Sequence, residues 1–209
     1  MKCDFCDELS AHGGTRFHSI YAGLLEARIA LRDCGFAALP TIGQLFEGSY
    51  LVIPTRHVEK YTEMSRPQRQ KAQAFLADVE RRLQRYGPTI AYEHGASSVN
   101  GTGCGVYHAH VHVVPLPQAT SCDQLLKGSG IYVPTLTDAW DAAEAAPEYL
   151  AVRDTSGQVA LLSDIPAANP LGSQFMRKRL VELFELSSPW DWREYELPES
   201  KLIRSVRTL

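Results

Sequence analysis

The sequence predicts an α+β protein in which helices flank an antiparallel sheet. Apolar segments on both sides of the turns at 33–35 and 154–157 predict two hairpins, and strands joined by a hairpin pair antiparallel. Residues 65–87 have the apolar spacing of one long amphipathic helix. Residues 103–115 predict a strand that carries three alternating histidines. We therefore expect one sheet, covered by helices, that presents the histidines.

The first elements are a hairpin and a separate strand. Segments 27–32 and 36–39 are predicted to pair across a turn that ends in Gly35, where glycine supplies a positive φ. The apolar run 50–53 ends at Pro54 and is followed by His57. A histidine just past a strand end is well placed for a functional site.

The helix predicted over residues 65–87 has clear boundaries. Ser65 suits the N-cap, Gln68 completes a capping box, and Gly87 ends the helix. Its apolar stripe is expected to pack on the sheet. Residues 90–93 predict the next strand, and the glycine-rich segment 95–105 leads into the histidine strand.

The histidine strand concentrates chemical groups. His108, His110 and His112 alternate with small or β-branched apolar residues. Because successive side chains of a strand point to opposite faces, we expect the three imidazoles on one face and the apolar side chains in the core. An unperturbed imidazole has a pKa of roughly 6.5, so the row can offer a nucleophile, a proton donor and a metal ligand near neutral pH.

The segment after residue 117 has weaker signals. Residues 125–132 are expected to be irregular, and the alanine-rich, acidic segment 138–147 suits a short surface helix. Segments 149–153 and 159–162 form the second predicted hairpin, and residues 173–186 predict a helix. The tail through Trp190 and Trp192 is expected to pack rather than to be disordered.

Composition narrows the function classes. The chain has 209 residues, of which 44% are hydrophobic and 22% charged, as in a globular protein. No apolar run approaches the roughly 18 residues of a membrane span. The formal net charge of −3 gives no basic surface for a nucleic acid polymer. Residues 1–6 lack a secretory signal's apolar region, and the 5 cysteines are an odd number, so we expect a reducing, cytoplasmic location.

The residues from His108 through Val114 resemble the signature of the histidine triad (HIT) family, His-φ-His-φ-His-φ-φ, in which φ is apolar. Residues 51–57 are similar to the family's strand and histidine that precede the triad, and Cys3-x-x-Cys6 resembles its N-terminal cysteine pair. The resemblance implies a HIT domain at residues 1–117. Residues 118–209 are similar to the C-terminal extensions of longer HIT-like proteins and are expected to pack on the same domain as a hairpin and a helix.

The resemblance also implies an activity. In the family the middle histidine, here His110, attacks an α-phosphorus to form a nucleotidyl-histidine, and the third, here His112, contacts phosphate oxygens. The chain is therefore expected to act as a nucleotide hydrolase or nucleotidyltransferase on a dinucleoside polyphosphate, a phosphoramidate or a nucleotide conjugate. Family members often pair, so a homodimer is a further expectation.

Substrate contacts are expected around the triad. Backbone N–H groups of Gly103, Cys104 and Gly105 could cradle a phosphate, since glycine lets a backbone approach closely. Cys104 and Gly105 also replace polar side chains that are common in the family. Asn100, or the stretch 92–95, could supply substitutes, although His94 can equally be an ordinary strand-end histidine.

Two more distant segments supply the remaining substrate candidates. Thr41 stands where many family members carry an aspartate that holds the ribose, which leaves ribose recognition open. Gln174 and Arg177 lie at the start of a predicted helix, where anions bind well. The alternative for this helix start is an ordinary solvated face.

A zinc site is implied by zinc-bearing relatives of the family, including the galactose-1-phosphate uridylyltransferase branch. Cys3, Cys6, His57 and His108 would form the S2N2 set that zinc accepts in closed structural sites. The alternative is a pair of free thiols, with His57 hydrogen-bonded to the triad.

Two other functions stay open at this point. The three triad histidines could bind a catalytic zinc that activates water, as in a metallohydrolase. Alternatively, Thr41 and Gly105 could indicate a nucleotide-binding regulatory module with little turnover.

Overall fold

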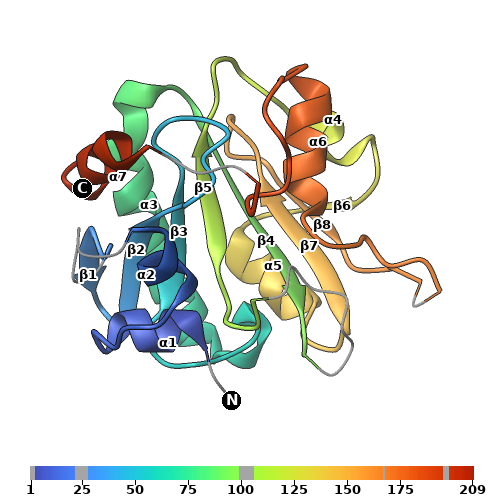
Figure 1. The fold of residues 1–209 in the computed structure, drawn as a ribbon. Coiled ribbons are helices and arrows are strands. Elements are labelled where there is room, and N and C mark those ends of the chain that lie inside the picture. Colours follow the sequence, from blue (N-terminus) through green and yellow to red (C-terminus); the bar gives the residue numbers. More distant parts are fainter. Residues whose placement is uncertain (1–2, 22–27, 99–105, 167, 195–197) are drawn as a thin grey trace.

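The computed structural model describes residues 3–21, 28–98, 106–166, 168–194 and 198–209, and Figure 1 shows the arrangement of their elements. The strands of these residues form one antiparallel sheet in the order β1-β2-β3-β5-β4-β7-β8-β6. The strands are β1 Leu31–Asp33, β2 Phe36–Pro40, β3 Tyr50–Pro54, β4 Thr89–Ala96, β5 Val111–Pro115, β6 Ile131–Val133, β7 Glu148–Arg153 and β8 Val159–Leu162. The expected α+β fold with an antiparallel sheet is confirmed.

Helices lie on both faces of this sheet (Figure 1). Those of the described residues are α1 Asp4–Leu9, α2 Arg16–Ile20, α3 Arg66–Leu83, α4 Cys122–Leu126, α5 Leu136–Ala142, α6 Phe175–Leu183 and α7 Glu199–Val206, with 3-10 turns η1 Tyr61–Glu63 and η2 Gln84–Tyr86. One core lies under α3 and α5. Two other cores, one under α4 and α6 and one under α1, bury the sheet side chains that alternate with those of the first core. No helix of the described residues is long and apolar enough to cross a membrane.

The first hairpin forms where the turn residues favour it. Cys34 has a φ of 51° and Gly35 a φ of 87°, the left-handed pair that a tight two-residue hairpin turn requires. Pairing runs from Leu31 opposite Ala38 to Asp33 opposite Phe36. The predicted hairpin is therefore present, with a first strand shorter than segment 27–32, of which residue 27 lies outside the described residues.

The long helix α3 begins as predicted. Ser65 and Gln68 form a capping box at its N-terminus, and its apolar stripe is buried against the sheet. The α-helix ends at Leu83 and continues as η2, so it is shorter than the predicted range 65–87. Gly87 has a φ of 124°, and a Cβ there would lie 2.4 Å from the carbonyl oxygen of Leu116, so the chain turns where no side chain fits.

The histidine strand is shorter than predicted. Pairing to β3 runs only from Tyr50 opposite Val113 to Val52 opposite Val111. Before Val111 the chain leaves β3, because the N–H of Ala109 donates to the carbonyl oxygen of Val58 at 2.7 Å. The expectation of one strand over 103–115 is wrong in extent, and residues 103–105 lie outside the described residues.

The segment after residue 117 differs most from expectation. Residues 125–132, expected to be irregular, hold the end of α4 and the start of β6. Of the segment 138–147, expected to be a surface helix, residues 138–142 lie in α5, which begins at Leu136, ends at Ala142 and buries Trp140 completely. The helix predicted at 173–186 is the shorter α6. In the tail, Trp192 packs on Gly43, whereas Trp190 is partly exposed.

The second hairpin, β7 with β8, forms at the predicted segments. Strand β7 pairs with β4 over six residue pairs, so the sheet is continuous between the parts of the chain before and after residue 117. This pairing also extends β4 to residue 96, beyond the predicted range 90–93. The assignment of residues 1–117 and 118–209 as domain and extension stays a prediction.

Because Gly95 has no side chain, the ring of Tyr149 on β7 can lie over the backbone of β4 at this position. A Cβ on Gly95 would lie 2.3 Å from two ring carbons of Tyr149, which is completely buried. We expect Gly95→Ala to lower the free energy of unfolding by about 1–3 kcal/mol, because the ring must shift in a packed core. Urea denaturation measures this loss.

The matched control for this substitution is Gly13→Ala. Gly13 is exposed and has no atom within 4 Å of a built Cβ, so the variant should unfold like the parent protein. Equal unfolding free energies for the two variants would contradict the packing argument.

Candidate functional site

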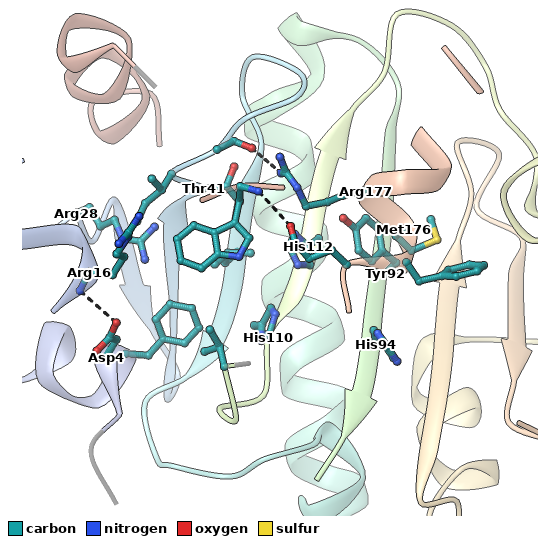
Figure 2. Close-up of a pocket in the computed structure, with 18 of the residues that line it drawn as sticks. Asp4, Arg16, Arg28, Thr41, Tyr92, His94, His110, His112, Met176 and Arg177 are labelled. Carbon is teal, nitrogen blue, oxygen red and sulfur yellow. Dashed lines mark hydrogen bonds between the residues drawn. The ribbon is translucent and has the colours of Figure 1, made fainter. Parts of the chain in front are cut away.

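The triad lies beside a cavity of about 110 Å³ on the sheet face opposite α3. Figure 2 shows His110 and His112 beside this cavity, with Tyr92 and His94 on the neighbouring strand β4. Side chains from α1, from the loop after β2 and from α6 complete its walls. The structure therefore brings together residues that are far apart in the sequence.

His110 is oriented by a hydrogen bond within the triad. Its Nδ1 lies 2.8 Å from the carbonyl oxygen of His108. Because a carbonyl only accepts, Nδ1 carries the proton, and Nε2 holds the lone pair of the neutral ring. The edge of the Phe5 ring packs against His110 at 5.8 Å between centroids. His110 thus presents a defined tautomer at the cavity wall.

His112 lies next to His110 and stacks on Tyr92. The His112 and Tyr92 rings are 4.6 Å apart with planes within 10°, and the His110 and His112 rings are 5.2 Å apart. Desolvation, followed by the charge of a protonated His110, lowers the pKa of His112 well below its usual value of 6.5. His112 is therefore neutral at neutral pH and can act as a hydrogen-bond donor toward a ligand.

His108 faces a different set of partners. Its Nδ1 lies 3.4 Å from Cys3 Sγ and 3.6 Å from Cys6 Sγ, and Cys6 Sγ lies 3.4 Å from His57 Nδ1. One potential donor atom from each of these four residues lies within 4.8 Å of the others. Bond lengths of about 2.3 Å to sulfur and about 2.05 Å to nitrogen place tetrahedral zinc ligands about 3.6 Å apart. The donor set therefore fits a tetrahedral zinc ion.

The surroundings of His108 prepare it as a ligand. Its Nε2 donates to the carbonyl oxygen of Pro54 at 2.9 Å, which leaves Nδ1 as the ring's lone-pair donor. Burial lowers the pKa of His108 to about 4, so the ring is neutral. Burial and the adjacent Cys3 thiol raise the pKa of Cys6 to about 11. A bound cation would offset this cost of forming the thiolate.

The other expected substrate residues have partners within the chain. Thr41 lines the cavity, but its hydroxyl donates to the carbonyl oxygen of Ser49 at 3.2 Å. Gln174 precedes α6 and has a left-handed φ of 59°. Its side-chain amide donates to the carboxylate of Asp191 at 2.9 Å, and its amide oxygen accepts from the N–H of Trp192 at 3.1 Å. Their contacts with a substrate stay predictions.

Arg177 also lines the cavity and bonds to two distant backbone segments. It donates to the carbonyl oxygens of Trp190 and Gly43, each at 2.5 Å. These bonds hold the C-terminal tail against the loop after β2. A substrate contact by Arg177 stays a prediction, and the expected contacts by Asn100, Gly103, Cys104 and Gly105 fall outside the described residues.

Sequence reasoning missed Arg28 and Trp192 of this cavity, and it named His94 without its partner Glu148. Arg28 forms a buried ion pair with Glu8 at 2.8 Å and donates to the carbonyl oxygen of Pro40 at 2.8 Å. His94 pairs with Glu148, and Trp192 reaches the cavity from the tail. None of these contacts follows a local spacing rule, although the position of His94 next to the glycine-rich segment was a usable signal.

Glu93 lies in the core on the other face of β4. The N–H of Tyr61 donates to its Oε1 at 3.0 Å, and the hydroxyl of Tyr149 donates to its Oε2 at 2.6 Å. Desolvation outweighs these two hydrogen bonds and raises the pKa of Glu93 from 4.5 to about 7. This carboxyl group therefore titrates near neutral pH beneath the site.

Comparison with known proteins gives one family. Residues 26–119 match the model of the HIT domain. No curated protein matches the sequence.

Solved structures from three organisms are similar to this chain over part of its length. A protein of Streptococcus mutans UA159 is 23% identical over 69% of this chain and 82% of its own, with a TM-score of 0.43. A Zn-bound histidine triad family protein from Mycobacterium smegmatis is 21% identical over 69% and 92%, with a TM-score of 0.38. A hypothetical histidine triad nucleotide-binding protein from Sulfolobus tokodaii is 22% identical over 56% and 71%, with a TM-score of 0.41.

The raised pKa of Glu93 gives a pH-dependent stability. The folded protein holds this proton up to about pH 7 and the unfolded chain only to about pH 4.5, so Glu93 stabilises the fold at low pH and loses this contribution as the pH rises. The variant Glu93→Gln has no carboxyl group at this position, so it does not lose this contribution as the pH rises. We subtract the unfolding free energy of the parent protein from that of the variant. This difference should rise by about 3 kcal/mol between pH 4.5 and pH 8.

Urea denaturation at several pH values measures this difference. Because both proteins share every other titrating group, the subtraction isolates Glu93. A difference that stays constant with pH would contradict the raised pKa.

Proposed function

We propose, from the premise that this chain carries a histidine triad domain at residues 26–119, that it binds small nucleotides and cleaves them at the α-phosphate. The orientation of His110 carries this proposal. Its Nδ1–H is committed to the carbonyl of His108, so Nε2 of the neutral ring is the atom that can attack phosphorus. The reaction is nucleotidyl hydrolysis or transfer.

The cavity residues suggest how the first step proceeds. The lone pair of His110 Nε2 forms the new bond to phosphorus, and the bond to the leaving group breaks on the opposite side. Neutral His112, 5.2 Å from His110 between ring centroids, donates a hydrogen bond to a phosphate oxygen as charge develops there. A second nucleophile, water or another acceptor, then releases the nucleotidyl group from His110.

Zinc is proposed as a structural cofactor held by Cys3, Cys6, His57 and His108. Four protein ligands complete a tetrahedral shell, so bound zinc would supply a cross-link rather than an open coordination position. The cross-link would join the start of α1 to the segment after β3 and to the triad. The Phe5 ring, two residues after Cys3, packs against both His108 and His110. The metal would thus hold the wall beside His110 in place.

The geometry disfavours a catalytic zinc bound by all three triad histidines. Nδ1 of His108 faces the two sulfur atoms, and its Nε2 bonds the carbonyl oxygen of Pro54. Since both nitrogens of His108 have partners away from the cavity, His108 cannot also join His110 and His112 around a metal there. The covalent route through His110 is therefore the proposed one.

The proposed partner is a small nucleotide rather than a nucleic acid polymer, in line with the net charge of −3. A homodimer and a cytoplasmic location stay predictions.

Replacing His110 with Ala should abolish turnover while leaving the fold intact. Intact-protein mass spectrometry, after brief mixing with diadenosine tetraphosphate or a panel of nucleoside phosphoramidates, should show a nucleotidyl adduct on the parent protein and none on the variant. His12→Ala is the matched control, because His12 is exposed and lies outside the cavity lining.

Two outcomes would overturn this assignment. An adduct on the His110→Ala variant would exclude His110 as the nucleophile. Tight mononucleotide binding by the parent protein, with neither adduct nor product on any substrate of the panel, would favour a binding module instead.

The zinc proposal is tested by metal content. Mass spectrometry for metals should find one zinc ion per chain in the parent protein and little in Cys6→Ser, because a hydroxyl is a much weaker zinc ligand than a thiolate. Chelation should lower the melting temperature of the parent protein, since zinc binding stabilises the folded state.

The control variant for this test is Cys34→Ser. Cys34 lies in the exposed turn of the first hairpin, outside the four-residue donor set, so this variant should keep its zinc. A parent protein that stays free of zinc after incubation with the metal would refute the proposal.

A further inference from the structure

A second histidine system lies in the same cavity. His94, on β4, lines the cavity with His110 and His112, and Figure 2 shows it on the strand next to the triad. Its Nε2 lies 2.6 Å from Oε1 of Glu148. The two side chains are only 10% and 6% exposed, so water screens this pair weakly. Neither residue has a role in the reaction through His110 and His112.

The pairing of β4 with β7 creates this contact. In the antiparallel register His94 lies opposite Leu150, and Ala96 lies opposite Glu148. His94 and Glu148 are therefore diagonal neighbours on one face of the sheet, within reach of long side chains. That face is the cavity face, because Tyr92, two residues before His94, stacks on His112.

The contact sets the chemistry of the His94 ring. A carboxylate only accepts hydrogen bonds, so Nε2 of His94 carries a proton toward Glu148. Nδ1 is then the ring nitrogen that can serve a ligand in the cavity. In the imidazolium form both ring nitrogens are protonated, so Nδ1 then carries a proton that can be transferred. His94 can therefore exchange a proton with a substrate while Glu148 keeps the ring oriented.

The proposed reaction needs such a group. When His110 Nε2 attacks phosphorus, an alkoxide or amide leaving group must gain a proton as its bond to phosphorus breaks. His112 is neutral and His110 is the nucleophile, so neither is suited to supply that proton.

We propose, resting on the proposed function, that His94 is the general acid for the leaving group and that Glu148 is its positioning residue. In the first step the phosphorus–nitrogen bond to His110 Nε2 forms, the bond to the leaving group breaks, and Nδ1 of His94 gives its proton to the departing atom. In the second step water attacks phosphorus from the vacated side and gives a proton to Nδ1 of His94. The bond to His110 Nε2 breaks, and the nucleoside monophosphate leaves.

The groups around His94 come from three elements. Glu148 faces it from β7, His112 and His110 lie on the triad segment, and Arg177 lines the cavity from α6. Glu148→Gln replaces the carboxylate that accepts from Nε2 of His94 by an amide of nearly the same shape. The rate of a step that needs a protonated leaving group should therefore fall, while the KM of the substrate changes little.

The decisive test compares two leaving groups on His94→Gln. The substrates are a nucleoside phosphoramidate with an alkylamine leaving group and the p-nitrophenyl ester of the same nucleoside monophosphate. Adduct formation from the phosphoramidate should slow by about 10²- to 10⁴-fold, because the amine needs a proton. Formation from the ester should slow by less than about 10-fold, since p-nitrophenolate leaves unprotonated.

The second step and a matched control add two readouts. The adduct formed from the ester should persist longer on His94→Gln than on the parent protein, because the same residue accepts the proton from water. His12→Gln, an exposed histidine outside the cavity lining, should match the parent protein with both substrates. Glu148→Gln should slow adduct formation from the phosphoramidate more than from the ester, with little change in the KM of either substrate.

The outcomes separate this inference from the proposed function. Equal slowing of both substrates, or no slowing of either, in His94→Gln would overturn the role of His94 while leaving His110 as the nucleophile. Loss of the adduct from the parent protein would instead overturn the proposed function.

If His94→Gln does not fold, a measurement on the parent protein tests the role of His94. With general acid catalysis, the rate of adduct formation should depend only weakly on the basicity of the leaving group across a series of esters and amides. A steep dependence in the parent protein would contradict the assignment of His94.

Discussion

The position of β5 between β3 and β4 is the constraint on which the site depends. His112 lies opposite both Leu51 of β3 and Tyr92 of β4, so the register on both sides fixes the face that it presents. Val111 and Val113 point the other way into the core under α3. A slip by one residue would place an imidazole in that core and two valines in the cavity, at a cost of several kcal/mol. The apolar packing of β5 therefore specifies the functional face.

The end of strand pairing matters as much as its register. The N–H of Ala109 donates a hydrogen bond to the carbonyl oxygen of Val58 and not to β3, so the backbone before Val111 departs from strand geometry. His108 can then face Cys3 and Cys6 while His110 stays at the cavity. The three histidines are chemically identical, but they have different hydrogen-bond partners. The acceptor on one ring nitrogen, Pro54 for His108 and His108 itself for His110, decides what the other nitrogen can do.

Local rules predicted the elements whose determinants lie close together in the sequence. The capping box of α3, the tight turn at Cys34 and Gly35, and the alternation of Val111, His112 and Val113 are all of this kind. Helix α5 was misjudged because its alanine-rich, acidic composition suggests a surface. Its acids instead pair with arginines of α3, and its Trp140 stacks on Tyr61 at 4.7 Å. Composition cannot show such partners.

The chemical partners in the cavity were hidden for the same physical reason. His94 and Glu148 are 54 positions apart in the sequence, and their contact exists only because β7 pairs beside β4 in the sheet order. Arg177 and Gln174 lie at a helix start, as expected, but their hydrogen bonds go to a tail whose path no periodicity describes. A Cβ on Gly43 would lie 2.9 Å from Cα of Trp192, so that path also depends on a distant glycine. Sequence patterns thus identify the proposed nucleophile, whereas the proposed proton-transfer pair emerges only from the assembled sheet.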